Sequence, residues 1–254
     1  MQAKKPAPRA KQVPKSKGLL DPSTLPNGLE RLERAIAHMG LASRREAKAL
    51  IVAGKIRVNG KVVKEPGFGI KVGVDTIDTG KKLAETKESF LVYKARGIET
   101  TRTAPGNRDL KNQYPKLAHL SPIGRLDKDS EGLIIMSNDG TLTRALTGEN
   151  SHIGKEYTVS VRENITNDAL DKMHTGIVID KIPTKPADVK RISRSVFAIT
   201  LFEGRKHQIR RMCDACHLTI ESLVRTKIGH LKIGAMEAGS MNQIAQKDID
   251  LLKA

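Results

Sequence analysis

The segment from Ile123 to Met136 constrains the fold most, because polar side chains crowd directly in front of a short apolar run. It reads IGRLDKDSEGLIIM, and its last four residues, Leu133–Met136, are all apolar. A bounded apolar run of this length is typical of a strand that is buried on both faces. Asp127 lies between Arg125 and Lys128, so we expect a carboxylate with cationic neighbours. Such a carboxylate acts either as a nucleophile or base, or as one half of a structural salt bridge.

The same segment imitates the first half of a calcium-binding loop, with acidic residues at 127, 129 and 131 before Gly132. A calcium loop needs a bidentate glutamate at its twelfth position, which is Asn138 here, and the residues between are apolar. The sequence therefore argues against calcium, and we expect no metal site.

The pattern Cys213-x-x-Cys216-His217 is that of haem attachment. No second cysteine pair or spaced histidine pair accompanies it to complete a zinc site. At helical spacing the two thiols share one face, so we expect packing residues.

Strand and helix patterns on both sides of Asp127 predict an α+β domain. Phe90–Tyr93 is a short apolar strand, Lys155–Val161 alternates with Tyr157 on its apolar face, and Val196–Phe202 is a further strand. We also expect a helix from about Thr166 to Gly176, a basic helix beginning near His207, strands at 224–228 and 231–233, and a terminal helix at 246–253.

The stretch from Lys94 to Pro122 is basic and shows little periodicity. Structureless loops of this length are uncommon in compact domains and are usually functional or mobile. We expect either a finger that closes on a phosphate backbone or a surface insertion without a role.

A separate small module is predicted before position 80. Apolar residues at helical spacing from Leu29 predict one helix, and Ser43 with Glu46 forms a capping box for a second. Asn59-Gly60, between two short apolar runs, predicts a hairpin. Arginines near a helix N-terminus form a natural phosphate site, and the alternative is solvated charge. The basic residues gathered there are Arg44, Arg45, Lys48, Lys55 and Arg57.

The charge balance favours polyanionic partners. Against 45 Lys+Arg the chain has 28 Asp+Glu, a net charge of +17, which suits nucleic acid or an anionic membrane. We interpret residues 1–28 as a basic flexible tail and residues 81–88 as a linker. No apolar run approaches the roughly 18 residues of a membrane span, so we expect no membrane. Two cysteines cannot staple 254 residues, which favours a reducing compartment, the cytoplasm.

The first module resembles a known RNA-binding domain. From Leu32 to about Ile77 the chain carries SRREA followed by GKIRVNG, which is similar to the module first known from ribosomal protein S-four. The resemblance implies that residues 29–80 bind structured RNA. It makes Arg44, Arg45, Lys48 and Arg57 candidate RNA-binding residues.

Three motifs of the second domain resemble those of the pseudouridine synthases, in the RsuA/RluB/RluE/RluF branch. They are GRLD at 124–127, KEY at 155–157 and GRKHQIRRMC at 204–213, and the likeness covers about residues 29–235. The resemblance implies a mixed, mainly antiparallel sheet with flanking helices over residues 89–254, and a central cleft for the target uridine. The implied reaction isomerises uridine to pseudouridine and needs no cofactor.

The resemblance also implies a role for each site residue. Asp127 is the essential catalytic residue, as nucleophile or as base on the ribose, and the sequence leaves both open. Tyr157 packs against the base, and Arg210 pairs with Asp127. Arg125 fills the space left by the extruded base, and Ile209 packs beside the uracil.

Two departures from the family pattern concern target choice more than activity. Lys94-Ala-Arg-Gly97 replaces a Lys-Pro-x-Gly turn, and residues 238–244 lack the usual Arg and Trp. The favoured function is a site-specific uridine isomerase of ribosomal RNA, preferably of the large subunit, acting as a monomer without a small-molecule substrate. The alternatives are a transfer RNA target and a catalytically silent RNA-binding or ribosome-assembly factor on the same scaffold.

Overall fold

The computed structural model describes residues 24–25, 29–39, 41–42, 44–79, 87–101, 106, 108–148 and 151–254. Most of the expected tail, the capping residue Ser43 and most of the expected linker lie outside these residues. Thr24 and Leu25 pair with the strand that begins at Leu29, although both were expected in the tail. This corrects the expected start of order at Leu29, because backbone pairing of a two-residue strand leaves no side-chain pattern.

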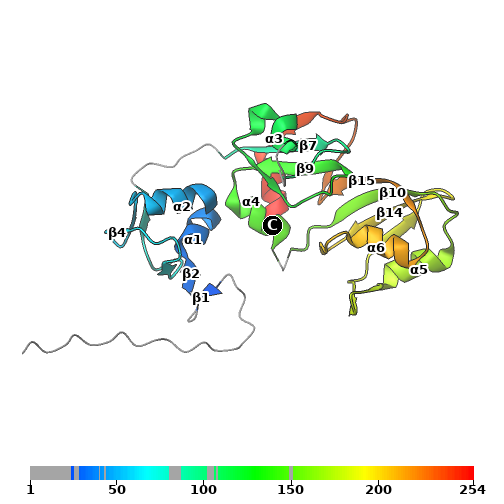
Figure 1. Ribbon diagram of the computed structural model, residues 1–254, viewed down its shortest axis with the longest axis horizontal. Coiled ribbons are helices and arrows are strands. Elements are labelled where there is room, and N and C mark those ends of the chain that lie inside the picture. The colour runs from blue at the N-terminus through cyan, green and yellow to red at the C-terminus, as the bar shows by residue number, and fades with distance from the viewer. Residues whose placement is uncertain are drawn as a thin grey trace, which may run out of the picture.

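The N-terminal module packs two helices against two small sheets (Figure 1). The sheets have the strand orders β1-β2-β5 and β4-β3-β6. Leu29 lies in a strand and not in the expected helix, which begins at Leu32. The core is built from one face of each helix and from alternate strand residues, such as Leu32, Ile51 and Ile56. The elements are β1 (Thr24–Leu25), β2 (Leu29–Arg31), α1 (Leu32–His38), α2 (Arg44–Val52), β3 (Ile56–Val58), β4 (Lys61–Val63), β5 (Gly69–Ile70) and β6 (Ile77–Asp78).

The expected hairpin is confirmed. β3 and β4 are antiparallel neighbours, and Asn59 (φ 49°) and Gly60 (φ 77°) form the two-residue turn between them. Positive φ at both turn residues is what a tight hairpin needs, and asparagine and glycine adopt it most readily.

One nine-stranded sheet forms the second domain (Figure 1), and its main path runs β13-β14-β10-β15-β9-β7-β17. Every pair is antiparallel except β9 with β15, which confirms the predicted mixed, mainly antiparallel α+β fold. Its strands are β7 (Ser89–Lys94), β8 (Ser121–Ile123), β9 (Glu131–Ser137), β10 (Lys155–Val161), β13 (Asp188–Arg191), β14 (Val196–Leu201), β15 (Ile220–Ile228), β16 (Leu231–Lys232) and β17 (Met241–Gln243), with a separate hairpin of β11 (Val178–Ile179) and β12 (Ile182–Pro183).

Helices cover different parts of this sheet. α4 (Gly140–Thr147) and α7 (Gln246–Lys253) pack on one face of β9, against Leu133 and Ile135. α5 (Asn167–Thr175) and α6 (Gln208–Ala215) pack on β10 and β14, where Val159 and Phe197 are fully buried. The expected strands at 90–93, 155–161 and 196–202 and the helices at 166–176 and 246–253 are therefore confirmed.

The stretch from Lys94 to Pro122 is more ordered than its sequence indicated. It contains α3 (Leu110–Gln113) and a 3-10 helix at Pro115–Leu117. Leu110, Tyr114 and Leu117 are buried against the second face of β9, so β9 is buried on both faces as predicted. The long-loop interpretation is wrong for residues 108–122. Leu110, Tyr114 and Leu117 do stand at helical spacing, but Pro115 interrupts the run, and helical segments of four and three residues are too short to give a clear periodic pattern.

Both cysteines are packing residues in the α5–α6 core, as expected. Cys213 is fully buried, and this burial raises the pKa of its thiol to about 12. Cys216 is partly buried against the same core, and burial also raises its pKa. Within the described part of the chain, no three histidine, cysteine or acidic residues gather as metal ligands would.

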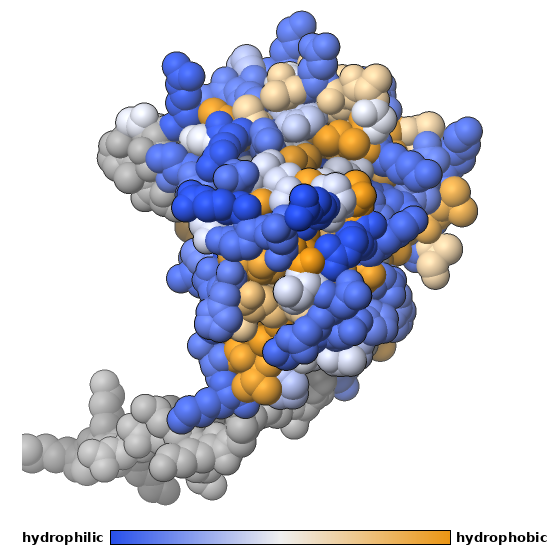
Figure 2. Space-filling model, turned by 90° about the vertical axis from the view of Figure 1, so that its right-hand side faces the viewer, coloured by the Kyte–Doolittle hydropathy of each residue, from blue (hydrophilic) through white to orange (hydrophobic). Residues whose placement is uncertain are grey.

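Figure 2 views the end of the molecule that lies to the right in Figure 1, and hydrophilic residues cover most of it. Hydrophobic residues are scattered between them. Val178 and Ile182 of the β11–β12 hairpin are exposed, as is Ile192. None of the described helices combines the length and apolar composition needed to cross a bilayer.

Candidate active site

Asp127 lies in the turn between β8 and β9, at the centre of the sheet. Gly124, with φ 74°, starts this turn, and the amide of Ser130 closes it by donating to the carbonyl of Asp127 at 3.1 Å. The side chain of Asp127 is 40% exposed, so a large substrate can reach its carboxylate.

Hydrogen bonds from a neighbouring segment hold the backbone on both sides of Asp127. The buried hydroxyl of Thr100 donates to the carbonyl of Leu126 at 2.6 Å and accepts from its amide at 2.9 Å. The carbonyl of Lys128 accepts from the amide of Gly97 at 2.8 Å. Asp127 therefore has an accessible carboxylate on a fixed backbone. No sequence pattern pointed to Thr100, because it lies in an irregular stretch with no motif.

Lys94, the last residue of β7, connects this strand to the same loop. Its side chain is fully buried, and Nζ donates to the carbonyls of Ile98 (2.6 Å), Ala95 (3.1 Å) and Lys128 (3.4 Å). Burial lowers the pKa of Lys94 to about 8, and the charges of Glu131 and Asp127 limit the shift. The Lys94–Gly97 turn thus forms without the family's proline, so the departure noted in the sequence removes no support from the loop.

His207 lies beside Asp127, and the sequence analysis did not single it out. Its Nε2 lies 3.5 Å from Oδ1 of Asp127, and its backbone has φ 54° at the start of α6. A left-handed backbone at a residue other than glycine is uncommon and marks a constrained position. The motif GRKHQIRR contains this histidine, so the presence of an imidazole in a site motif was the signal that could have identified it.

Arg210 does not form the expected pair with Asp127. Its Nη2 donates instead to the hydroxyl of the buried Ser130 at 3.1 Å. The reason is geometric: α6 begins beside Asp127, so His207 is nearest to the carboxylate, and Arg210 lies one helical turn further along the same face. Arg210 therefore supports the far end of the Asp127 loop.

Tyr157 and Arg225 face each other across β10 and β15. Nη1 of Arg225 lies 3.5 Å from the phenol oxygen, and its guanidinium carbon lies 5.9 Å from the ring centroid. The same Nη1 donates to the carbonyl of Arg125 at 3.3 Å, so this pair is connected to the Asp127 loop. Ile209 is buried in the core that Tyr157 borders, while Arg125 is exposed.

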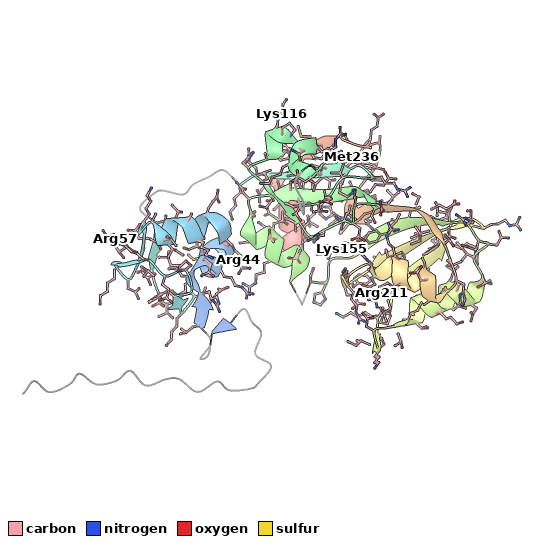
Figure 3. The ribbon with its side chains drawn as sticks, in the orientation of Figure 1. Arg44, Arg57, Lys116, Lys155, Arg211 and Met236 are labelled. Carbon is pink, nitrogen blue, oxygen red and sulfur yellow. The ribbon has the colours of Figure 1, made fainter. Side chains whose placement is uncertain are left out.

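The basic residues expected to bind RNA do not form one compact cluster. Arg44 and Lys48 are exposed on α2, Arg57 is exposed on β3, and the side chain of Arg45 lies outside the described residues. Figure 3 shows Arg44 on the side of the module toward the large sheet and Arg57 on its opposite side. The charge is spread over the module, which suits an extended phosphate backbone more than a single anion.

A hollow of about 470 Å³ lies elsewhere on the sheet. Glu156, Lys190, Thr200, Phe202 and Lys227 are among its lining residues, and neither Asp127 nor Tyr157 is. The site around Asp127 is separate from it.

Comparison with known proteins agrees with this architecture. The family of RNA pseudouridylate synthases matches residues 88–215, and the S4 domain matches residues 30–75. The "Ribosomal large subunit pseudouridine synthase B" of Bacillus subtilis (strain 168) is 34% identical over 237 residues, which are 89% of this chain and 96% of the relative. The "Dual-specificity RNA pseudouridine synthase RluF" of Escherichia coli (strain K12) is 34% identical over 236 residues, 90% of this chain and 80% of the relative.

The three-dimensional likeness extends over both parts of the molecule. A crystal structure described as that of pseudouridylate synthase superposes with a TM-score of 0.66 and 27% identity, over 87% of this chain and 99% of that one. The GRLD turn between β8 and β9 lies within the residues that match the family. The chain belongs to the RNA pseudouridylate synthase family and is an isomerase that converts uridine in RNA to pseudouridine.

Proposed function

We propose that this protein isomerises one specific uridine of ribosomal RNA, in the large subunit, with Asp127 as its essential carboxylate. The name of the Bacillus subtilis relative supports this RNA class. The observation that carries the assignment of Asp127 is the fixed backbone around it. Thr100, Gly97 and Lys94 hold the residues on both sides, while the carboxylate itself stays accessible.

The reaction moves bonds without oxidation or reduction. The N1–C1′ glycosidic bond breaks, the uracil turns, C5 bonds to C1′, the hydrogen on C5 leaves as a proton and N1 gains one. No outside group or electron acceptor is consumed. Side chains that act as nucleophile, acid or base are therefore enough for the reaction. Asp127 acts on the ribose, and as a carboxylate it suits either attack on C1′ or removal of a ribose proton.

The surrounding residues have distinct proposed roles. His207, whose Nε2 lies 3.5 Å from Oδ1 of Asp127, orients the carboxylate. Tyr157 packs against the uracil, and the buried Ile209 supports that wall of the cleft from the core. Arg125 is exposed on the same turn as Asp127, so it suits the space left by an extruded base. Arg210 acts through Ser130 on the end of the loop.

The N-terminal module supplies affinity for structured RNA. Arg44, Lys48 and Arg57 are exposed and basic, and we include Arg45 with them. Contacts of this kind position a protein on RNA without reading its sequence. We place the reaction in the cytoplasm, with one chain acting on one RNA and with no membrane partner or small-molecule substrate.

The experiment compares cells that lack the protein with the same cells carrying the wild type, Asp127→Asn or Asp129→Asn. Asp129 is an exposed acidic neighbour and serves as the matched control. Pseudouridines are mapped across all cellular RNA. We expect one site in large-subunit ribosomal RNA that the wild type and Asp129→Asn restore and Asp127→Asn does not. A dependent site in transfer RNA, or no dependent site together with defective ribosome assembly, contradicts the proposal.

A further inference from the structure

Arg225 occupies the centre of the large sheet, between the two halves of the active site. On one side it is directly opposite Tyr157 of β10, and on the other it is opposite Gly132 of β9. The pairing of β10 with β15 shifts by one residue between Glu156 and Tyr157. Bulges of this kind change the direction of a side chain and are common next to active sites.

The guanidinium of Arg225 connects three separate segments of the cleft. Nε donates to the carbonyl of Leu133 on β9 at 2.6 Å. Nη1 donates to the carbonyl of Arg125 at 3.3 Å and to the phenol oxygen of Tyr157 at 3.5 Å. A single planar group thus fixes the start of the Asp127 turn relative to the tyrosine. Arginine suits this task because its donors are held in one rigid fork.

This arrangement has an energetic cost that packing alone does not explain. Arg225 is only 4% exposed, and none of its nitrogens pairs with a carboxylate of the described residues within 4.0 Å. Among those same residues its Nη2 is buried without a hydrogen-bond partner. A buried charge without a counter-charge is strongly unfavourable, and an apolar residue of similar volume would avoid the penalty.

The positive charge of Arg225 affects the pKa values of two neighbouring lysines. Burial is the main reason that the pKa values of Lys94 and Lys155 are lowered, and the charge of Arg225 lowers both further. A cation kept at this position, with these consequences, indicates a function in the site.

We propose that Arg225 is a positioning residue for the isomerisation, acting through Tyr157 and through the turn that carries Asp127. A guanidinium donates hydrogen bonds and cannot accept them. The phenol oxygen of Tyr157 is therefore the acceptor, and its own hydrogen points away from Arg225. Arg225 in this way fixes both the place of the ring and the direction in which its hydroxyl donates. The proposal rests on the proposed function, because it assigns a role within the same site.

A double-mutant cycle tests this action through Tyr157. Single-turnover rates at saturating enzyme and dissociation constants for the RNA are measured for the wild type, Arg225→Lys, Tyr157→Phe and the double variant. We expect Arg225→Lys to lower the rate roughly tenfold or more, with the dissociation constant changed less than about twofold, and to lower it far less in the Tyr157→Phe background. The matched control is Arg162→Lys, since the Arg162 side chain is 72% exposed and its ion pair with Glu221 is 3.9 Å long.

Equal rate losses in the two backgrounds, or a folded Arg225→Lys with the full rate, overturn the proposal. A measurement that does not depend on enzymatic activity distinguishes failure of this proposal from failure of the proposed function. The chain has three tyrosines, so the ring-carbon NMR signal of Tyr157 is the one that disappears in Tyr157→Phe. That signal must move in Arg225→Lys and stay in place in Arg162→Lys. If it moves although the wild type modifies no ribosomal RNA, the proposed function fails and the contact stands. If it does not move, the positioning role is wrong.

Discussion

The hydroxyl of Thr100 satisfies both backbone groups of Leu126, donating to its carbonyl at 2.6 Å and accepting from its amide at 2.9 Å. Leu126 is the residue directly before Asp127, and Thr100 is 4% exposed. One side chain from an irregular segment therefore makes the two backbone hydrogen bonds that a neighbouring β-strand would otherwise make to this turn. This contact holds the backbone directly before Asp127.

Thr100→Val keeps the shape of the side chain and removes its hydroxyl. Both backbone groups of Leu126 would then be buried without a partner, so we expect the free energy of unfolding to fall by about 2–4 kcal/mol. We also expect the single-turnover rate to fall roughly 10- to 100-fold, because the displaced turn misplaces Asp127. Denaturant unfolding and single-turnover kinetics measure the two effects. Thr175→Val, at an exposed threonine on α5, is the control, and equal behaviour of the two variants would disprove this account of Thr100.

Gly132→Ala tests the close contact between β9 and β15. A β-carbon at this position would lie 2.4 Å from the carbonyl oxygen of Arg225, and Gly132 also has φ 105°. The two strands would have to separate at the one parallel pairing of the sheet, so we expect a loss of more than about 3 kcal/mol or no folded protein. Gly239→Ala is the control, since φ is 90° there and the nearest atom is 3.7 Å away. A thermal melt of Gly132→Ala close to that of the control contradicts the expected strain.

Asp139 makes stability depend on pH in the acid range. Burial opposes its ionisation, but hydrogen bonds from Lys253 and Thr141 outweigh burial and lower its pKa to about 2, from 3.8. A carboxyl group with a lowered folded-state pKa adds stability above the unfolded value and loses it as the pH falls through the folded value. We therefore expect about 2 kcal/mol of stability to disappear between roughly pH 4 and pH 2.

Asp139→Asn measures this contribution, because asparagine still caps α4 through its side-chain oxygen. Urea unfolding at a series of pH values should show the stability difference between wild type and Asp139→Asn shrinking as the pH falls. Lys253→Met should weaken the same dependence, because its ammonium lies 2.6 Å from the carboxylate. A difference that stays constant down to pH 2 would show that the Asp139–Lys253 pair is not the cause.

The basic residues of the N-terminal module should control the salt dependence of RNA binding. Each lost phosphate contact lowers the slope of log affinity against log salt by roughly 0.7–0.9. The triple variant Arg44→Gln, Lys48→Gln, Arg57→Gln should thus lower the slope by about 2 while the rate at saturating RNA is unchanged. Lys247→Gln, on the exposed side of α7, is the control. An unchanged slope in the triple variant would remove these residues from the RNA interface.

Local signals account for the parts of the fold that the sequence predicted. The apolar run Leu133–Met136 indicated a doubly buried strand, and β9 is buried on both faces. Thr166 caps α5 through its side chain and Gly176 ends it, as their positions indicated. In both cases the information lies within a few residues of the element.

The parts that were missed depend on distant contacts. Leu110 and Tyr114 belong to helical segments too short to give a clear pattern, and they are buried because they pack on β9. The sequence Asn138-Asp139-Gly140 is typical of a turn, yet Gly140 is the first residue of α4, because Asp139 caps the helix. A glycine after a capping residue gives the same local pattern in a turn and at a helix start.

The site shows the same division. The motifs identified Asp127 and Tyr157, but the residues that hold them are Thr100, His207 and Arg225, from segments far apart in the chain. Arg210 was expected beside Asp127 and lies at Ser130, because the direction of α6 is set by packing in the core. These contacts cannot be predicted from residue spacing, because they join segments that are far apart in the sequence.

The most direct test of the central claim is release of the C5 hydrogen from large-subunit ribosomal RNA labelled with [5-³H]uridine. Isomerisation must free this hydrogen as a proton, whichever way Asp127 acts on the ribose. With purified protein we predict one equivalent of tritium per RNA for the wild type and for Asp129→Asn. For Asp127→Asn, at unchanged RNA affinity, we predict no release above background. Tritium release by Asp127→Asn at the wild-type rate would contradict the assignment of Asp127 as the essential residue.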